Sequence, residues 1–156
     1  MEMALAEARQ AELMDEVPIG AIVVYHGKVI GAGHNIRERF QNAAYHAELL
    51  AIMEACEYLG SWRLEECDLY VTLEPCMMCS GAIMNSRIRT LYYGAKNPKA
   101  GTVESLYHLL SDSRFNHQVE IRSGIKENEC QQLLKQFFKR VRKARKAARK
   151  SAQQKN

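Results

Sequence analysis

A cysteine pair that directly follows an apolar strand constrains this chain more than any other feature. The segment Pro75-Cys76-Met77-Met78-Cys79 comes after the apolar run 68–73 and leads into a second apolar segment, an order that predicts strand, tight turn and helix. Proline favours an extended residue before it and suits the first turn of a helix, so Cys76 and Cys79 should lie one helical step apart. Unpaired backbone N–H groups in that turn favour thiolates. Two thiolates at this spacing suit a tetrahedral zinc ion.

His46 is the best candidate for a third ligand. It opens a second helical segment, in which one buried stripe is predicted from the spacing of His46, Leu49, Leu50, Met53 and Cys56. Glu48 is predicted to lie off that face, where it is better placed to reach a water at the metal than to bind the metal itself. Three protein ligands and a water are typical of a catalytic zinc site.

The other cysteines fit poorly as a fourth ligand, which a structural zinc site would need. Cys56 is about 15 Å along the helix from His46. Cys67 is roughly 20 Å from Cys76, at the far end of the strand. Only Cys130 is not excluded by these distances.

The two motifs together form a specific pattern. His-x-Glu followed by Pro-Cys-x-x-Cys is the signature of the zinc-dependent nucleobase deaminases. The segments His46-Ala47-Glu48, 72–79 and Gly81-Ala82-Ile83 resemble the bacterial tRNA-specific adenosine deaminases, and the resemblance extends over nearly the whole chain.

The resemblance implies an activity, a fold and roles for single residues. The activity is conversion of the wobble adenosine of a tRNA anticodon to inosine by a homodimer with one Zn²⁺ per subunit. His46, Cys76 and Cys79 are implied as zinc ligands, Glu48 as the residue that moves protons, and Asn35 as a contact to the base.

Length and pattern predict one domain of the α/β class. With 156 residues and 47% apolar composition, the chain can bury a sizeable core. The fold implied by the resemblance is a three-layer α/β/α cytidine-deaminase-like fold, with helices on both faces of a mixed five-stranded sheet. Strands are predicted at 19–25, 28–33, 68–73, 90–94 and 119–122, and helices at 1–13, 49–59, 77–84, 103–110 and from 127 onward. Met3 is expected on the apolar side of the first helix, and Trp62 in the core.

The expected location is the cytoplasm. The chain has no apolar stretch near 18 residues and no charged-then-apolar leader. Its odd number of cysteines, two of them assigned to the metal, fits a reducing compartment.

Two polar loops are predicted beside the metal. Residues 34–42 lack helical or strand period and run into His46, which makes Asn35 available either to a base edge or to a turn. Residues 95–101 form a basic, turn-rich loop at the same sheet edge as Cys76, if strands 68–73 and 90–94 are parallel. Lys96 and Lys99 are candidates for phosphate contacts there. The related deaminases often carry aspartate where Asn97 stands, although an amide can also bond a ribose 2′-hydroxyl.

The end of the chain is strongly basic. From Lys139 onward there are nine basic residues and no acidic ones, whereas the preceding residues include thirteen basic and eighteen acidic ones. The body (1–138, the predicted deaminase domain) therefore carries −5 and the tail (139–156, a basic extension of the last helix) carries +9, an asymmetry that favours a polyanionic partner. A solvated helix end is the alternative. Phe137 and Phe138 have core spacing, yet an aromatic pair beside a basic helix also suits a stacked base.

These observations lead to one predicted set of substrate contacts and two rival functions. The predicted contacts to the substrate are Asn35, Ala47, Asn97, Lys99, Phe137, Phe138, Arg140 and Arg142. One rival is a deaminase of a free base, nucleoside or nucleotide, which needs no extended basic surface. The other is a zinc-stabilised RNA-binding module without catalysis, which leaves Glu48 without a role.

Overall fold

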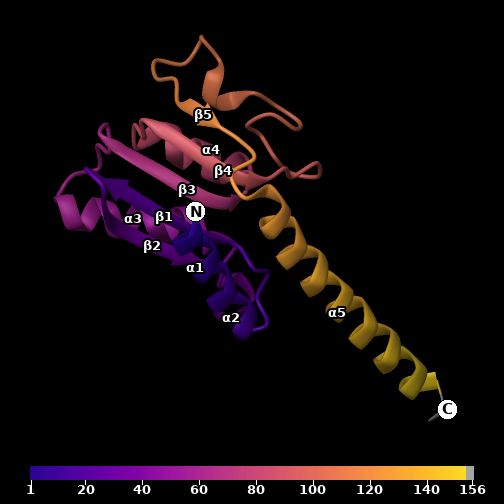
Figure 1. The fold of residues 1–156 in the computed structure, drawn as a ribbon. Helices are drawn as coiled ribbons and strands as arrows, with labels where there is room; N and C mark the ends of the chain where they lie inside the picture. The colour runs from indigo at the N-terminus through magenta and orange to yellow at the C-terminus, as the bar shows by residue number, and fades with distance from the viewer. Residues whose placement is uncertain (154–156) are drawn as a thin grey trace.

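The protein is built on a five-stranded sheet with helices on both faces (Figure 1). The computed structural model describes residues 1–153. The strands are β1 (Gly20–Tyr25), β2 (Lys28–His34), β3 (Cys67–Leu73), β4 (Thr90–Ala95) and β5 (Glu120–Arg122). The helices are α1 (Glu2–Leu13), α2 (Arg37–Phe40), α3 (Ala47–Leu59), α4 (Met77–Asn85), the 3-10 helix η1 (Leu109–Ser111) and α5 (Glu127–Gln153). The predicted fold class is confirmed.

The sheet is mixed, with the strand order β2-β1-β3-β4-β5. β1 is antiparallel to both β2 and β3, while β3, β4 and β5 are parallel to one another. Leu73 of β3 pairs with Ala95 of β4. The cysteine motif and the basic loop therefore start from the same edge of the sheet, as the sequence predicted.

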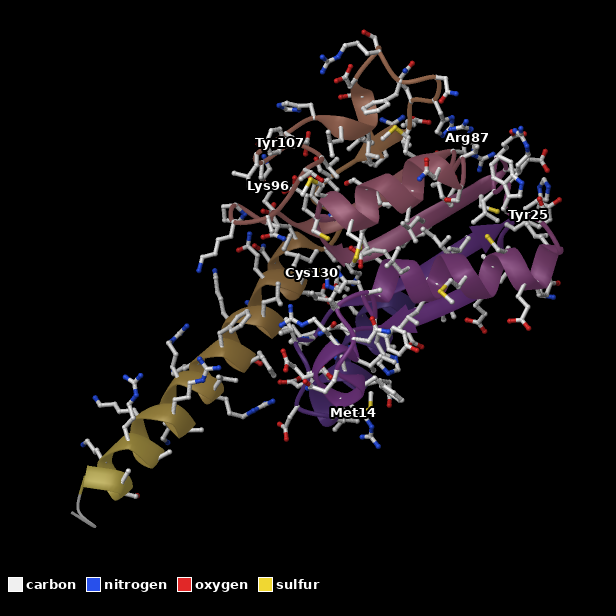
Figure 2. The ribbon with its side chains drawn as sticks, turned by 180° about the vertical axis from the view of Figure 1, so that it is seen from behind. Met14, Tyr25, Arg87, Lys96, Tyr107 and Cys130 are labelled. Atoms are coloured by element: carbon white, nitrogen blue, oxygen red, sulfur yellow. The ribbon has the colours of Figure 1, made fainter. Side chains whose placement is uncertain are left out.

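The helices divide between the two faces of the sheet. Helices α1 and α5 lie on the face seen in Figure 1, and α3 and α4 on the face seen from behind in Figure 2. The larger core cluster fills the space between the sheet and α3 and α4, and it includes Val23, Leu69, Val71, Ile83 and Leu91. Figure 2 also shows Lys96 and Tyr25 at opposite ends of the sheet, so residues 95–101 lie far from the β1–β2 hairpin.

The predicted buried stripe of α3 is wrong. Met53 is 64% exposed, and the residues that face the sheet are Ala47, Glu48, Ala51, Ile52 and Ala55. The reason is the close approach of α3 to β2, where a Cβ atom at Gly31 would lie 2.2 Å from the backbone oxygen of Ala51. Only small side chains fit along this contact, and Glu48 consequently lies on the buried face of α3 rather than off it.

Three smaller predictions also differ from the structure. Met3 and Trp62 are exposed instead of buried. Residues 103–110 form turns that lead into η1 instead of a regular helix. The backbone N–H groups of Leu106 and Leu109 bond the carbonyls of Gly101 and Thr102, which is not the i→i−4 pattern of an α-helix, and the N–H groups of 103–105 bond the carboxylate of Glu74.

Helix α5 begins on the sheet and ends far from it. Its first turns pack against β4 and β3, and Cys130 and Phe137 are buried, whereas Phe138 is 42% exposed. The rest of the helix extends well beyond the body (Figure 1), and its basic residues are exposed. Residues 154–156, the end of the predicted basic extension, lie outside the described residues. Within residues 1–153, no helix has the length and apolar character needed to cross a membrane.

Candidate active site

Two helix starts bring three metal-binding side chains together. His46 is the N-cap of α3 and Cys76 the N-cap of α4, and Cys79 lies in the first turn of α4. Nδ1 of His46 lies 3.6 Å from Sγ of Cys76 and 3.5 Å from Sγ of Cys79. Tetrahedral zinc with ordinary bond lengths would hold its nitrogen and sulfur ligands about 3.6 Å apart. The donor atoms and their spacing therefore fit a zinc ion.

The two thiols differ in their electrostatics. A hydrogen bond from Cys79 lowers the pKa of Cys76 to about 4, and a hydrogen bond from His46 adds to this effect. The bond to Cys76, together with burial, raises the pKa of Cys79. The hydrogen bond with Cys76 also raises the pKa of His46. A divalent cation among these three groups would hold both sulfurs as thiolates.

Glu48 contributes a buried carboxyl group beside the three ligands. It lies in the first turn of α3, two residues after His46, and is 4% exposed. Burial raises the pKa of Glu48 to about 7. A carboxyl group in such a setting can both accept and donate a proton near neutral pH.

A small pocket, with a cavity volume of about 50 Å³, opens beside this cluster. Its walls come from the end of β3, the start of α3, and the segments just before β1, after β2, after β3 and after β4. The lining residues are Ile19, Asn35, His46, Ala47, Glu48, Leu73, Glu74, Cys76 and Asn97. The structure thus brings Asn35, Ala47 and Asn97 to the same pocket as the metal-binding residues.

Asn35 is held in place by Glu16, a residue that was not predicted from the sequence to belong to the site. Its side-chain amide donates to Oε2 of Glu16 and to the carbonyl of Val17. Glu16 is almost fully buried, and its other carboxylate oxygen accepts the backbone N–H of Arg39. The only signal in the sequence was a carboxylate directly before Val17-Pro18.

Glu74 is a second missed residue. It is 1% exposed, although it stands between an apolar strand and the cysteine motif. Burial opposes ionisation of this carboxyl, but hydrogen bonds from the N–H groups of Asn97, Glu104 and Ser105 and from the Ser105 hydroxyl more than offset it and lower its pKa. The signal in the sequence was its position immediately before Pro75.

The remaining cysteines lie away from the metal-binding group. Among the described residues, the cluster of possible metal ligands consists of His46, Cys76 and Cys79. Cys130, which distance alone did not exclude, is buried in α5 against Gly94 (Figure 2 labels it). It is therefore a packing residue on the opposite face of the sheet from α3 and α4.

The other candidate substrate contacts lie outside the pocket. Lys96 and Lys99 are exposed on the loop after β4. Arg140 pairs with Glu12 of α1 at 2.9 Å and lies over the ring of Phe137. Arg142 is exposed on the projecting part of α5. The structure thus ties Arg140 and Phe137 to the body and leaves Phe138 and Arg142 facing solvent.

Comparisons with known proteins find similarity to deaminases. The model of the MafB19-like deaminase family matches residues 1–142. The chain is similar to the tRNA-specific adenosine deaminase of Bacillus subtilis (strain 168), with 51% identity over 151 residues, 97% of this chain and 94% of the relative. It is similar to the tRNA-specific adenosine deaminase of Agrobacterium fabrum, with 49% identity over 142 residues, 91% of this chain and 93% of the relative. A solved structure from work on A-to-I editing by tRNA:A34 deaminases at the wobble position is also similar, with a TM-score of 0.82 and 48% identity, covering 86% of this chain and 97% of that chain.

Proposed function

The chain belongs to the MafB19-like deaminases and, within them, to the tRNA-specific adenosine deaminases, and we propose on this basis that its pocket converts the wobble adenosine of a tRNA anticodon to inosine. One structural observation supports the proposed reaction. A nitrogen and two sulfurs with zinc-like spacing share a pocket with a buried carboxyl group and an amide. This combination supports hydrolytic deamination of a base.

We infer that His46, Cys76 and Cys79 hold one zinc ion per subunit. The separations of their donor atoms support this assignment. When bound, zinc would supply an activated water near neutral pH. The start of α4 favours the thiolate form of Cys76 and Cys79 that such binding needs.

Glu48 is the proton-moving residue in this proposal. It accepts a proton from the water that attacks C6 of adenine, and it returns protons to the ring nitrogen and to the departing amine. Ammonia leaves and inosine remains. Its burial next to His46 supports this role, because water is excluded from the carboxyl except on the side of the pocket.

Asn35 and Ala47 are proposed to hold the base. Asn35 is fixed by Glu16 and Val17, so its amide is presented to the pocket in one orientation. Ala47 has a small side chain between His46 and Glu48 and leaves space for a flat ring. An extruded adenine also needs contacts to the neighbouring nucleotides, for which Asn97 and Lys99 are suitably placed at the same sheet edge.

We further infer that residues 139–156 form an RNA-binding extension of the deaminase domain 1–138. The exposed basic residues of α5, among them Arg142, suit a phosphate backbone. Phe138 is exposed at the start of this extension and can stack on a base, whereas Phe137 and Arg140 support the helix against α1.

The enzyme is proposed to be a homodimer that joins through α3 and α4. Met53 of α3 and Met77 and Met78 of α4 are exposed apolar side chains on the two helices that carry the metal-binding residues. Light scattering should give twice the mass of the chain, and Met53→Glu combined with Met77→Glu should give the single mass. A parent that has the mass of one chain would rule this assembly out.

We also infer that the enzyme acts in the cytoplasm, where tRNA is found and thiols stay reduced.

Ammonia release from three substrates tests the proposed function. Purified zinc-loaded protein is given a short RNA hairpin with adenosine in its loop, free adenosine, or free cytidine. We expect release from the hairpin alone. Release from a free nucleoside but not from RNA would favour the free-base deaminase, and release from none of the three would favour the non-catalytic RNA-binding module.

A further inference from the structure

A loop wraps around one buried carboxylate at the edge of the pocket. Glu74 is the last residue before the cysteine motif, and its side chain is enclosed by residues 97–105. Its Oε1 accepts the backbone N–H groups of Val103 at 3.1 Å, Glu104 at 2.8 Å and Ser105 at 2.9 Å. Three successive N–H groups thus point at a single oxygen.

The second oxygen of the same carboxylate holds the other end of the loop. Oε2 of Glu74 accepts the backbone N–H of Asn97 at 2.9 Å and the hydroxyl of Ser105. All five contacts are donors, which is the set that an ionised carboxylate satisfies, because it can only accept. The loop is packed so closely that a Cβ atom at Gly101 would lie 2.5 Å from Oε2 of Glu74.

The loop is also joined to the metal-binding motif. Thr102 donates its backbone N–H to the carbonyl of Pro75 at 3.0 Å, and its hydroxyl bonds Oγ of Ser80 in α4 at 2.9 Å. Gly101 forms an isolated β-bridge with Cys76. Glu74 therefore lies between the residues that would hold the metal and the pocket wall formed by Asn97.

We propose that Glu74 is a positioning residue whose carboxylate fixes loop 97–105, and Asn97 with it, at the wall of the pocket that receives the nucleotides around the target adenosine. This inference rests on the proposed function, since it concerns how that pocket holds RNA. Glu74 itself does not react. Its effect passes through the position of the Asn97 backbone.

Glu74→Gln is the sharpest test, because glutamine keeps the size and changes one acceptor into a donor. The amide oxygen can still accept the three N–H groups of 103–105, but the amide NH₂ then faces the N–H of Asn97, and two donors repel. We expect parental zinc content and a kcat that changes little. We expect KM for the RNA hairpin to rise roughly tenfold, since a hydrogen bond to a charged group is lost.

Hydrogen exchange gives a readout that does not depend on catalysis. In Glu74→Gln, the amide of Asn97 should exchange faster than in the parent, while the amides of β1 and β3 keep their protection. Ser105→Ala is the matched control, because it removes one hydroxyl and leaves all four backbone N–H contacts, and it should keep the parental exchange at Asn97.

Gly101→Ala is a second variant in case Glu74→Gln does not fold. The added methyl group pushes the loop away from the carboxylate without altering β3, so it should reproduce the faster exchange and the higher KM.

Parental exchange and parental KM in Gly101→Ala and in any folded Glu74→Gln would overturn the positioning role. A global loss of protection and of zinc in Glu74→Gln, with Gly101→Ala unchanged, would also overturn it in favour of general structural support. A parent that releases no ammonia from RNA refutes the proposed function instead, and the exchange at Asn97 still decides the role of Glu74.

Discussion

The side-chain amide of Asn35 donates to the buried carboxylate of Glu16 across 3.3 Å. The same nitrogen lies 3.4 Å from the carbonyl of Val17, so both of these bonds use the amide nitrogen. The amide oxygen is the atom that remains to meet a substrate in the pocket. Glu16 thereby determines which atom of Asn35 would face a base in the proposed substrate complex.

Asn35→Ala should weaken turnover on RNA without changing zinc content. A buried polar edge of the base that loses its partner costs about 1–3 kcal/mol, which corresponds to roughly a five- to hundredfold loss in kcat/KM. Steady-state rates with the RNA hairpin measure the loss. A parental rate would mean that Asn35 only supports the turn of its loop.

Glu48→Ala should keep zinc and the fold but lose deamination, because in the proposed mechanism Glu48 moves protons and does not bind the metal. General acid–base catalysis contributes about 10²–10⁴-fold, and the rate should fall by that order. Glu48→Gln is the matched control, since it preserves the volume of the side chain but cannot ionise and so cannot act as a general acid or base at neutral pH, and it should be as inactive. Loss of zinc from either purified variant would make Glu48 a ligand or a structural support.

Cys76→Ala and Cys79→Ala should each lose both zinc and activity. Their Tm should also fall, because a ligand that binds only the folded state stabilises it. Cys56→Ala is the control, since Cys56 lies outside the metal-binding group and should keep its zinc. Full zinc occupancy in either of the first two variants would contradict the three-ligand scheme.

Removing charge from the projecting part of α5 should weaken RNA binding for many sequences alike. The variant replaces Arg142, Lys143, Arg145, Lys146, Arg149 and Lys150 by glutamine, which preserves helix propensity. None of these six residues has an ion pair within residues 1–153, and Arg140, which pairs with Glu12, is left in place. Each lost phosphate contact should reduce the salt slope of binding by roughly 0.7–0.9.

The control for this variant is Arg63→Gln. Arg63 is exposed and lies near Tyr25 of the β1–β2 hairpin, and Figure 2 shows Tyr25 at the end of the sheet opposite Lys96. Its ion pair within residues 1–153 is with Glu65, and its guanidinium lies over the ring of Trp62. It should keep the parental affinity and slope, and kcat at saturating RNA should change little in both variants. A tail variant with parental affinity and slope would identify the tail as a solvated helix end.

The clustering of His46, Cys76 and Cys79 was predictable from the sequence because much of its geometry is local. Cys76 and Cys79 share one helical turn, and a strand followed by proline indicates where that turn begins. Both His46 and Cys76 proved to be helix caps. The parallel pairing of β3 with β4 then followed from the strand–helix–strand pattern, and it brought the basic loop to the same edge of the sheet.

The supporting carboxylates were not predictable in the same way. Glu74 binds backbone N–H groups 23 to 31 residues further along the chain, in a loop whose conformation leaves no periodic signal. Glu16 acts on Asn35 across 19 residues. The buried face of α3 was predicted wrongly for a related reason. The residues of α3 that can face the sheet are limited by its close contact with Gly31 of β2. The periodicity of α3 alone carries no information about that glycine.

Inosine formation in a full tRNA tests the central claim most directly. A tRNA with adenosine at the wobble position is incubated with the zinc-loaded enzyme, and its sequence is then read for inosine, with Glu48→Ala as the parallel sample. We expect inosine at the wobble position only, and none with the variant. Unchanged adenosine in the tRNA, or inosine formed equally at other positions, would contradict the assignment of this pocket to the wobble adenosine.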